Sequence, residues 1–192
     1  MAVKSKPFLT DIKTLRRRAR EHIHKGAITA GYKADRETVL KVLNEALATE
    51  IVCVLRYKYH YYMASGINAK AIADEFLQHA NEEQGHADLI SLRITQLGGA
   101  PNLSPAGLLT RSHSEYVEGE DLVDMIKEDL VAERIAIESY SEIIRYLGND
   151  DPTTRRMMED ILAMEEEHAE DLSTMLAELG HQGEPARPRK RR

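Results

Sequence analysis

Residues 72–97 have the sequence IADEFLQHANEEQGHADLISLRITQL, and this stretch decides the fold. Apolar residues recur in it at steps of three and four, the period of an α-helix that buries one face. Glu83 and His86 interrupt this apolar stripe near its middle and lie one helical turn apart on the same face. Charged groups at buried positions are costly unless something compensates them. The segment therefore predicts a helix of a bundle with a site inside it.

Three other segments show the same helical period. Together the four run over residues 35–64, 69–97, 120–147 and 152–179, with almost no β-type alternation. Short turns at Gly66 and around Asn149 join the first pair and the last pair, which predicts two antiparallel hairpins. The stretch from Gly99 to Gly119 is long enough to travel the length of a bundle. We therefore predict an all-α four-helix bundle with one long crossover between its second and third helices.

The two ends of the chain differ from the bundle. Residues 1–34 are predicted to be a basic N-terminal extension, with a short extra helical pattern over 8–25. The bundle is expected to occupy residues 35–180, because Gly180 stands where a final helix would stop. Residues 181–192 are rich in Gly, Pro and Arg and lack apolar periodicity, which predicts a disordered basic tail.

A Glu interrupts the apolar stripe of each long segment. Residues at the same height in an antiparallel hairpin are equidistant from its turn, so heights can be compared along the sequence. The midpoint between Glu50 and Glu83 falls at position 66.5, in the Gly66 turn, and that between Glu133 and Glu165 falls at 149, in the second turn. The four Glu residues are therefore predicted to form one layer.

His86 and His168 each follow one of these Glu residues by three positions. Four carboxylates in an apolar layer would repel one another and lose hydration, so a positive charge must lie between them. Four Glu and two His suit two ions of a first-row metal, with iron or manganese as the leading candidates. A single Glu-x-x-His in a helix is usually exposed and binds nothing, but two on matching apolar stripes favour a metal site.

Composition and charge set wider limits. The chain has 192 residues, one Cys and a net charge of −6, and no apolar run reaches the roughly 20 residues that a membrane helix needs. We expect a soluble, cytoplasmic protein without a membrane partner. Residues 1–26 and the last eight residues are strongly basic, whereas the body between them is strongly acidic. The body therefore attracts cations, and the termini are candidates for contact with nucleic acid.

Residues 38–179 resemble the ferritin superfamily, and specifically bacterioferritin. The resemblance is carried by motifs in the expected order, namely Leu43-Asn44-Glu45 through Glu50 to Tyr57, Glu83-Gln84-Gly85-His86-Ala87-Asp88, Gly99-Ala100-Pro101-Asn102-Leu103, Asp129-Leu130 with Glu133, and Glu165-Glu166-Glu167-His168.

The resemblance implies a ferroxidase centre that holds two iron ions per subunit. Its ligands would be Glu50, Glu83, His86, Glu133, Glu165 and His168, with Glu83 and Glu165 bridging the two ions. Tyr57 matches a Tyr near the di-iron centre of the family and would donate an electron or a proton, or else be a packed core residue. Asp129 is predicted to orient the two His ligands.

Two departures from the bacterioferritin pattern matter. Gln84 occupies the position of the Met that binds haem at a subunit interface, so we predict no haem. The chain also lacks the short fifth helix of twenty-four-subunit cages, which favours a homo-oligomeric dodecamer of the Dps-like kind. Such proteins often have a Cys pair near the metals, whereas the lone Cys53 is expected to be a small buried residue.

The expected function is oxidation of Fe(II) by dioxygen or hydrogen peroxide, with storage of the ferric product in a cage. A manganese catalase stays open as an alternative within the same fold, while the lack of a Cys-x-x-Cys pair weakens a rubrerythrin-like peroxidase. The third alternative is a Dps-like protein that binds DNA non-specifically through its basic termini, although those charges would also serve simply to keep the chain in solution.

Overall fold

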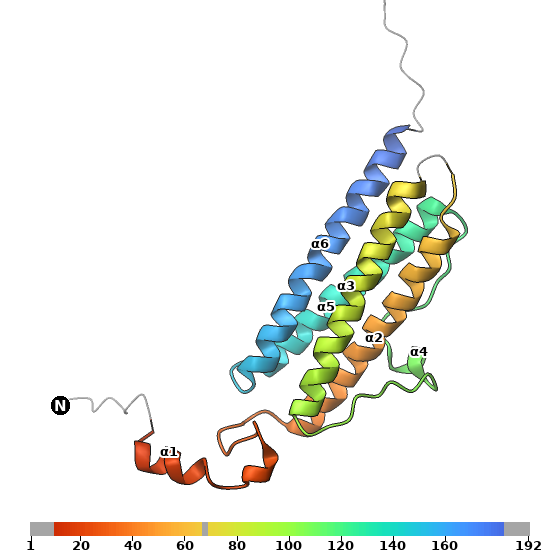
Figure 1. Cartoon of the computed structure of the whole chain (residues 1–192). Helices are drawn as coiled ribbons and strands as arrows, with labels where there is room; N and C mark the ends of the chain where they lie inside the picture. Colours follow the sequence, from red (N-terminus) through yellow and green to blue (C-terminus); the bar gives the residue numbers. More distant parts are fainter. Residues whose placement is uncertain (1–9, 67–68, 183–192) are drawn as a thin grey trace, which may run out of the picture.

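The computed structural model describes residues 10–66 and 69–182. Four long helices form a bundle: α2 (Arg36–Met63), α3 (Ala69–Gln96), α5 (Leu122–Leu147) and α6 (Pro152–Gln182). Helix α2 lies along α3 and α5 along α6 (Figure 1), and no strand occurs within the described ranges. The predicted all-α bundle of two hairpins is confirmed. None of the described helices combines the length and the apolar character that a membrane crossing requires.

Polar caps mark where the long helices begin. The side chain of Asp35 accepts a hydrogen bond from the Thr38 backbone N–H at the start of α2, and Asp121 does the same for Asp124 in α5. Such caps satisfy backbone donors that the first turn leaves unpaired. Helix α6 continues to Gln182, three residues beyond the predicted segment 152–179, because a glycine permits a helix to stop without forcing it to.

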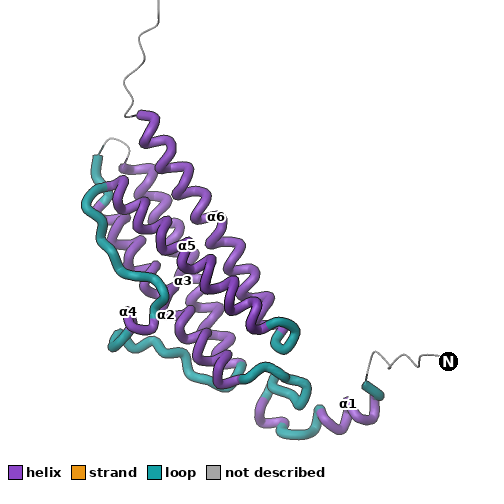
Figure 2. Tube along the Cα trace, turned by 180° about the vertical axis from the view of Figure 1, so that it is seen from behind, coloured by secondary structure: helices purple, strands orange, loops and turns teal. Residues whose placement is uncertain are grey.

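The crossover between α3 and α5 runs along the side of the bundle from one end to the other (Figure 2). It contains one short helix, α4 (Leu108–Arg111). At its start Gly99 packs so closely that an added Cβ would lie 2.5 Å from Leu40 Cδ2. Side chains of α2 then bind its backbone at successive heights, from Asn44, Thr49, Arg56 and His60. The crossover is therefore fixed against the helix that carries Glu50.

The N-terminal helical pattern is shorter than predicted over 8–25. Helix α1 covers Ile12–Arg18, and a separate 3₁₀ turn, η1, covers Ile23–Lys25. The apolar side chains of Ile12, Leu15 and Ile23 are exposed, and α1 lies apart from the bundle (Figure 1). Most helical stability in proteins comes from packing of an apolar face, so a helix that packs against nothing is only marginally stable. The first residues of the predicted segment, and most of the predicted tail from residue 183 onward, lie outside the described residues.

The interior of the bundle consists of two apolar clusters with a polar layer between them. One cluster contains Leu43, Leu47, Ile90, Ile94, Tyr140, Leu147 and Met158. The other contains Cys53, Tyr57, Ile72, Phe76, Ile126 and Leu172. Cys53 is 2% exposed, as expected for a small buried residue. Each large apolar side chain buried in this way contributes about 1.5–3 kcal/mol, which offsets the cost of the polar layer between the clusters.

Candidate metal centre

The six predicted ligands meet in the polar layer. Glu50 comes from α2 and Glu133 from α5, while α3 and α6 each contribute a Glu and the His three positions later. None of the six is more than 6% exposed. The layer predicted from distances to the two turns is therefore present, and the side chains of all four long helices point into it.

The six side chains form two overlapping groups. The first consists of Glu50, Glu83, His86 and Glu165, and the second of Glu83, Glu133, Glu165 and His168. Within each group, one ligand atom from every residue lies within 4.8 Å of the others. Glu83 and Glu165 belong to both groups, which is the arrangement expected of carboxylates that bridge two ions.

The donor atoms at the centre of the layer lack hydrogen-bond partners. The buried unpaired atoms include Glu50 Oε2, Glu83 Oε1, His86 Nδ1, Glu133 Oε2, Glu165 Oε1 and Oε2, and His168 Nδ1. They are nevertheless close together: His86 Nδ1 lies 3.1 Å from Glu165 Oε1, and His168 Nδ1 lies 3.3 Å from Glu83 Oε1. Buried polar atoms are normally paired, so a group of unpaired oxygen and imidazole donors aimed at one space fits a pair of first-row metal ions.

Electrostatics within the layer favour added positive charge. Burial and the charge of Glu83 raise the pKa of Glu50 well above its usual value, and burial together with Glu83 and Glu165 does the same for Glu133. Burial alone would lower the pKa of His168, but the neighbouring carboxylates of Glu165 and Glu83 raise it to about 10. The pKa of His86 is also raised, against the effect of burial, by Glu165, Glu50 and Glu83. Protons and metal ions therefore compete for this layer.

Two tyrosines hold the outer carboxylates. Tyr57 donates a hydrogen bond to Glu133 Oε1, and Tyr140 donates one to Glu50 Oε1. The sequence analysis predicts Tyr57 near the centre but assigns no role to Tyr140. The sequence does contain a signal for it, since each Tyr lies seven positions after a layer Glu, Tyr57 after Glu50 and Tyr140 after Glu133. Each hairpin therefore supplies the Tyr that holds the carboxylate of the other.

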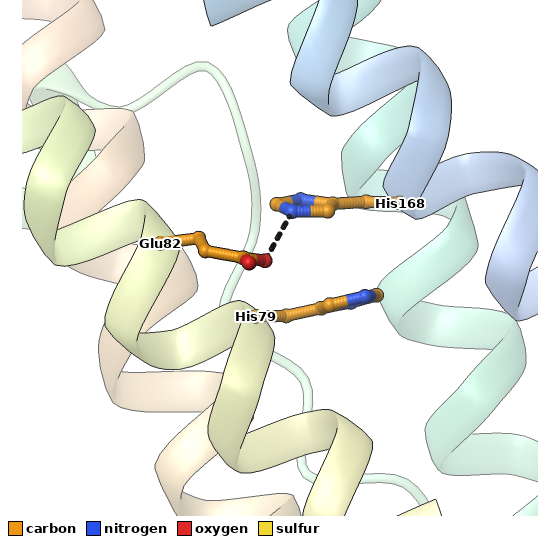
Figure 3. A group of neighbouring side chains, drawn as sticks. All are labelled: His79, Glu82 and His168. Carbon is orange, nitrogen blue, oxygen red and sulfur yellow. Dashed lines mark hydrogen bonds and ion pairs between the residues drawn. The ribbon is translucent and has the colours of Figure 1, made fainter.

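The outer side of His168 is occupied by two residues that the sequence analysis did not assign. His168 Nε2 lies 2.9 Å from Glu82 Oε2, and the ring of His79 stacks on that of His168 with centroids 4.0 Å apart (Figure 3). A carboxylate on the far nitrogen fixes the orientation of a metal-binding imidazole. Glu82 therefore has, for His168, the positioning role predicted for Asp129.

The prediction that Asp129 orients the His ligands is wrong. Its carboxylate accepts a hydrogen bond from Arg56 Nε at 2.8 Å and lies 2.7 Å from His60 Nδ1. Arg56 and His60 also contact the crossover carbonyls of Glu115 and Val117. Because α5 rotates Asp129 toward α2 and the crossover, its side chain fastens these elements together and does not reach either ligand imidazole.

Comparison with known proteins identifies the family of this chain. Residues 40–180 match the family model of the ferritin-like domain. The chain is 31% identical over 147 residues to the bacterioferritin of Mycobacterium leprae, covering 76% of this chain and 88% of that protein. It is 30% identical over 149 residues to the bacterioferritin of Rhodobacter capsulatus, covering 76% and 88%.

Solved structures give the same result. A dodecameric thioferritin, the bacterioferritin-related protein of Bacteroides fragilis, superposes with a TM-score of 0.75 at 32% identity, over 78% of this chain and 90% of that one. Dps from Thermosynechococcus elongatus shares the fold at a TM-score of 0.70 and 21% identity, over 73% and 90%. The fold, the extent of the match and the identity to bacterioferritins together show that this chain belongs to the ferritin family.

Proposed function

We propose that this protein oxidises Fe(II) at an intra-subunit centre and stores the ferric product inside a homo-oligomeric cage. The observation that carries the proposal is the pair of overlapping donor groups in which Glu83 and Glu165 are shared and the inward-facing atoms have no protein partner. Relationship to bacterioferritins supports iron as the substrate metal.

The chemistry asks little of the protein beyond positioning. Two Fe(II) ions each give up one electron, and the pair of electrons reduces hydrogen peroxide to water or dioxygen to hydrogen peroxide, with protons taken from solvent. Carboxylates bind both oxidation states of iron, and the imidazoles of His86 and His168 hold one ion each. Tyr57 and Tyr140 keep Glu133 and Glu50 in place, and the Tyr57 hydroxyl is positioned to pass a proton or an electron to the centre.

The test combines oxidation with retention of iron. The full-length protein, loaded anaerobically with two Fe(II) per chain, is mixed with dioxygen or hydrogen peroxide while ferric absorbance is followed. Larger additions of iron are then separated on a sizing column. We expect rapid oxidation and iron that travels with protein at roughly twelve times the mass of one chain. Iron that stays in the small-molecule fraction would contradict storage.

Matched variants of α5 assign the chemistry to the centre. Glu133→Gln removes one charged donor from the layer, whereas Glu138→Gln makes the same chemical change at an exposed position of the same helix. We expect the first to slow oxidation at least tenfold and the second to leave it unchanged. Equal rates in the two variants would refute the assignment.

The alternatives predict different outcomes of these experiments. A manganese catalase would disproportionate peroxide in a small oligomer and retain only about two metals per chain. DNA binding through the basic termini stays a prediction, and it would appear as a gel shift that salt abolishes and that deletion of residues 185–192 weakens. The absence of haem likewise stays a prediction that rests on Gln84, an exposed residue of α3.

A further inference from the structure

His79 has a buried nitrogen that the ferroxidase centre does not use. Its side chain is completely buried, yet Nε2 has no hydrogen-bond partner. Two carboxylate oxygens lie close to this nitrogen, Glu75 Oε1 at 3.5 Å and Asp171 Oδ2 at 3.9 Å. We propose that Glu75, His79 and Asp171 form a third, mononuclear site for a divalent metal ion beside the ferroxidase centre.

The hydrogen bonds of Tyr57 set the tautomer of His79 that a metal ion needs. The Tyr57 hydroxyl donates its only hydrogen to Glu133 and also lies 3.2 Å from His79 Nδ1. Because that hydrogen is already in use, His79 Nδ1–H is the donor in the second contact, and the lone pair of the neutral ring lies on Nε2. A metal-binding His commonly donates its other N–H in this way.

The spacing of the three donors suits one ion. Donors that bind a single ion at about 2.1 Å stand roughly 3.0–3.4 Å apart. The separations of 3.5 and 3.9 Å from His79 Nε2 need only a slight contraction to reach that range, and all three ligand atoms lie within 4.8 Å of one another. Glu75 lies one turn before His79 on α3, and Asp171 faces both from α6.

Exposure separates this site from the closed ferroxidase centre. The side chains of Glu75 and Asp171 are 31% and 46% exposed, while His79 forms the buried end. No Lys or Arg pairs with either carboxylate among the ion pairs of the described residues. Glu82, also near His79, is already held by His168 Nε2 at 2.9 Å (Figure 3). An ion can therefore enter from solvent and reach a buried imidazole donor.

The position of the site implies a role in supplying the centre. His79 stacks on the ligand His168 and contacts Tyr57, which holds the ligand Glu133. An Fe(II) ion bound at Glu75, His79 and Asp171 would thus be separated from the ferroxidase ligand His168 only by the ring of His79. This part of the inference rests on the proposed function, whereas binding of the metal does not.

Zinc tests the binding, because it needs no oxidation chemistry. Crystals of the full-length protein soaked in Zn²⁺ should show anomalous density between Glu75, His79 and Asp171, in addition to any at the ferroxidase centre. The double variant Glu75→Gln with Asp171→Asn should lose this peak alone. The control Asp74→Asn with Glu170→Gln makes the same charge change at the adjacent exposed positions and should keep it. A wild-type map without density there, or equal loss in the control, would overturn the site.

Iron kinetics test the supply role separately. At limiting Fe(II) the double variant should oxidise iron several-fold more slowly than wild type, while the limiting rate at saturating Fe(II) stays within twofold. The control variant should match wild type at both concentrations. A zinc peak combined with unchanged kinetics would refute the supply role. A zinc peak in a protein that oxidises no iron would refute the proposed function and leave the third metal site standing.

Discussion

Two buried clusters of charged residues in one bundle balance their charge in opposite ways. Around Asp129, the guanidinium of Arg56 supplies the positive charge, and His60 completes the contacts of the carboxylate. Around Glu83 and Glu165, no Arg or Lys pairs with a carboxylate among the described residues, and seven donor atoms are unpaired. The first cluster is complete as the chain folds. The second needs positive charge from a bound cation or from protons. This difference distinguishes a structural cluster from a binding site.

The largest expected effect comes from removing a shared carboxylate. Glu83→Gln should reduce the rate of Fe(II) oxidation by about a hundredfold or more, because both ions lose a ligand. The same change should raise the melting temperature of the metal-free protein, since it relieves repulsion between buried carboxylates. Stopped-flow absorbance and calorimetry measure the two effects, with Asp88→Asn on the exposed side of α3 as control. A lower melting temperature would show that the layer is balanced as the Asp129 cluster is.

The Asp129 cluster should respond in the opposite sense. Asp129→Asn leaves the buried Arg56 without its counter-charge, so we expect the free energy of unfolding to fall by about 3–5 kcal/mol. Denaturant titration measures this value. The exposed Asp150→Asn variant should change it by less than about 0.5 kcal/mol. A small decrease in the free energy of unfolding of Asp129→Asn would mean that Arg56 does not depend on Asp129 for its counter-charge.

The stability of the metal-free layer around Glu83 and Glu165 should depend on pH. In the metal-free protein the pKa of His168 is raised to about 10, above the value near 6.5 expected in an unfolded chain. The stability that His168 contributes is therefore present in full below pH 6.5 and is lost as pH rises through 10. The melting temperature of the metal-free protein should fall by several degrees between pH 7 and 10. In zinc-loaded protein, whose imidazoles are deprotonated by the metal, this fall should disappear.

The tyrosines should give the smallest effect. Tyr140→Phe and Tyr57→Phe each remove one hydrogen bond to a ligand carboxylate while keeping the ring in the core. We expect a two- to tenfold slower oxidation for Tyr140→Phe, and a larger decrease for Tyr57→Phe if its hydroxyl also passes a proton or an electron. Equal rates in the two variants would limit Tyr57 to positioning Glu133. Metal content of both variants should stay at the wild-type level.

The sequence was sufficient for the helices and for the layer that they share. Apolar spacing predicted the four long segments within a few residues, and distance from the two turns selected the four Glu residues now found together. Periodicity places a residue on a face, and antiparallel pairing places it at a height. Both quantities depend on the backbone alone, which explains their success.

Contacts across helices could not be predicted in the same way. The partners of Asp129, the contact of Glu82 with His168 and the stacking of His79 depend on how far each helix is rotated and on which rotamer is chosen. The N-terminal segment failed for a different reason. Its helical pattern finds no surface of the bundle to pack against, so only Ile12–Arg18 forms a helix.

Glu83 lies in the first hairpin and Glu165 in the second, so the ion that we propose they share would tie the two halves of the polypeptide together. Such a tie acts only on the folded state and makes local opening rarer as more metal is bound. Susceptibility to proteases should then follow iron supply, with starved copies degraded first and filled ones persisting. A cell would in this way keep the stores that are in use without a dedicated sensor.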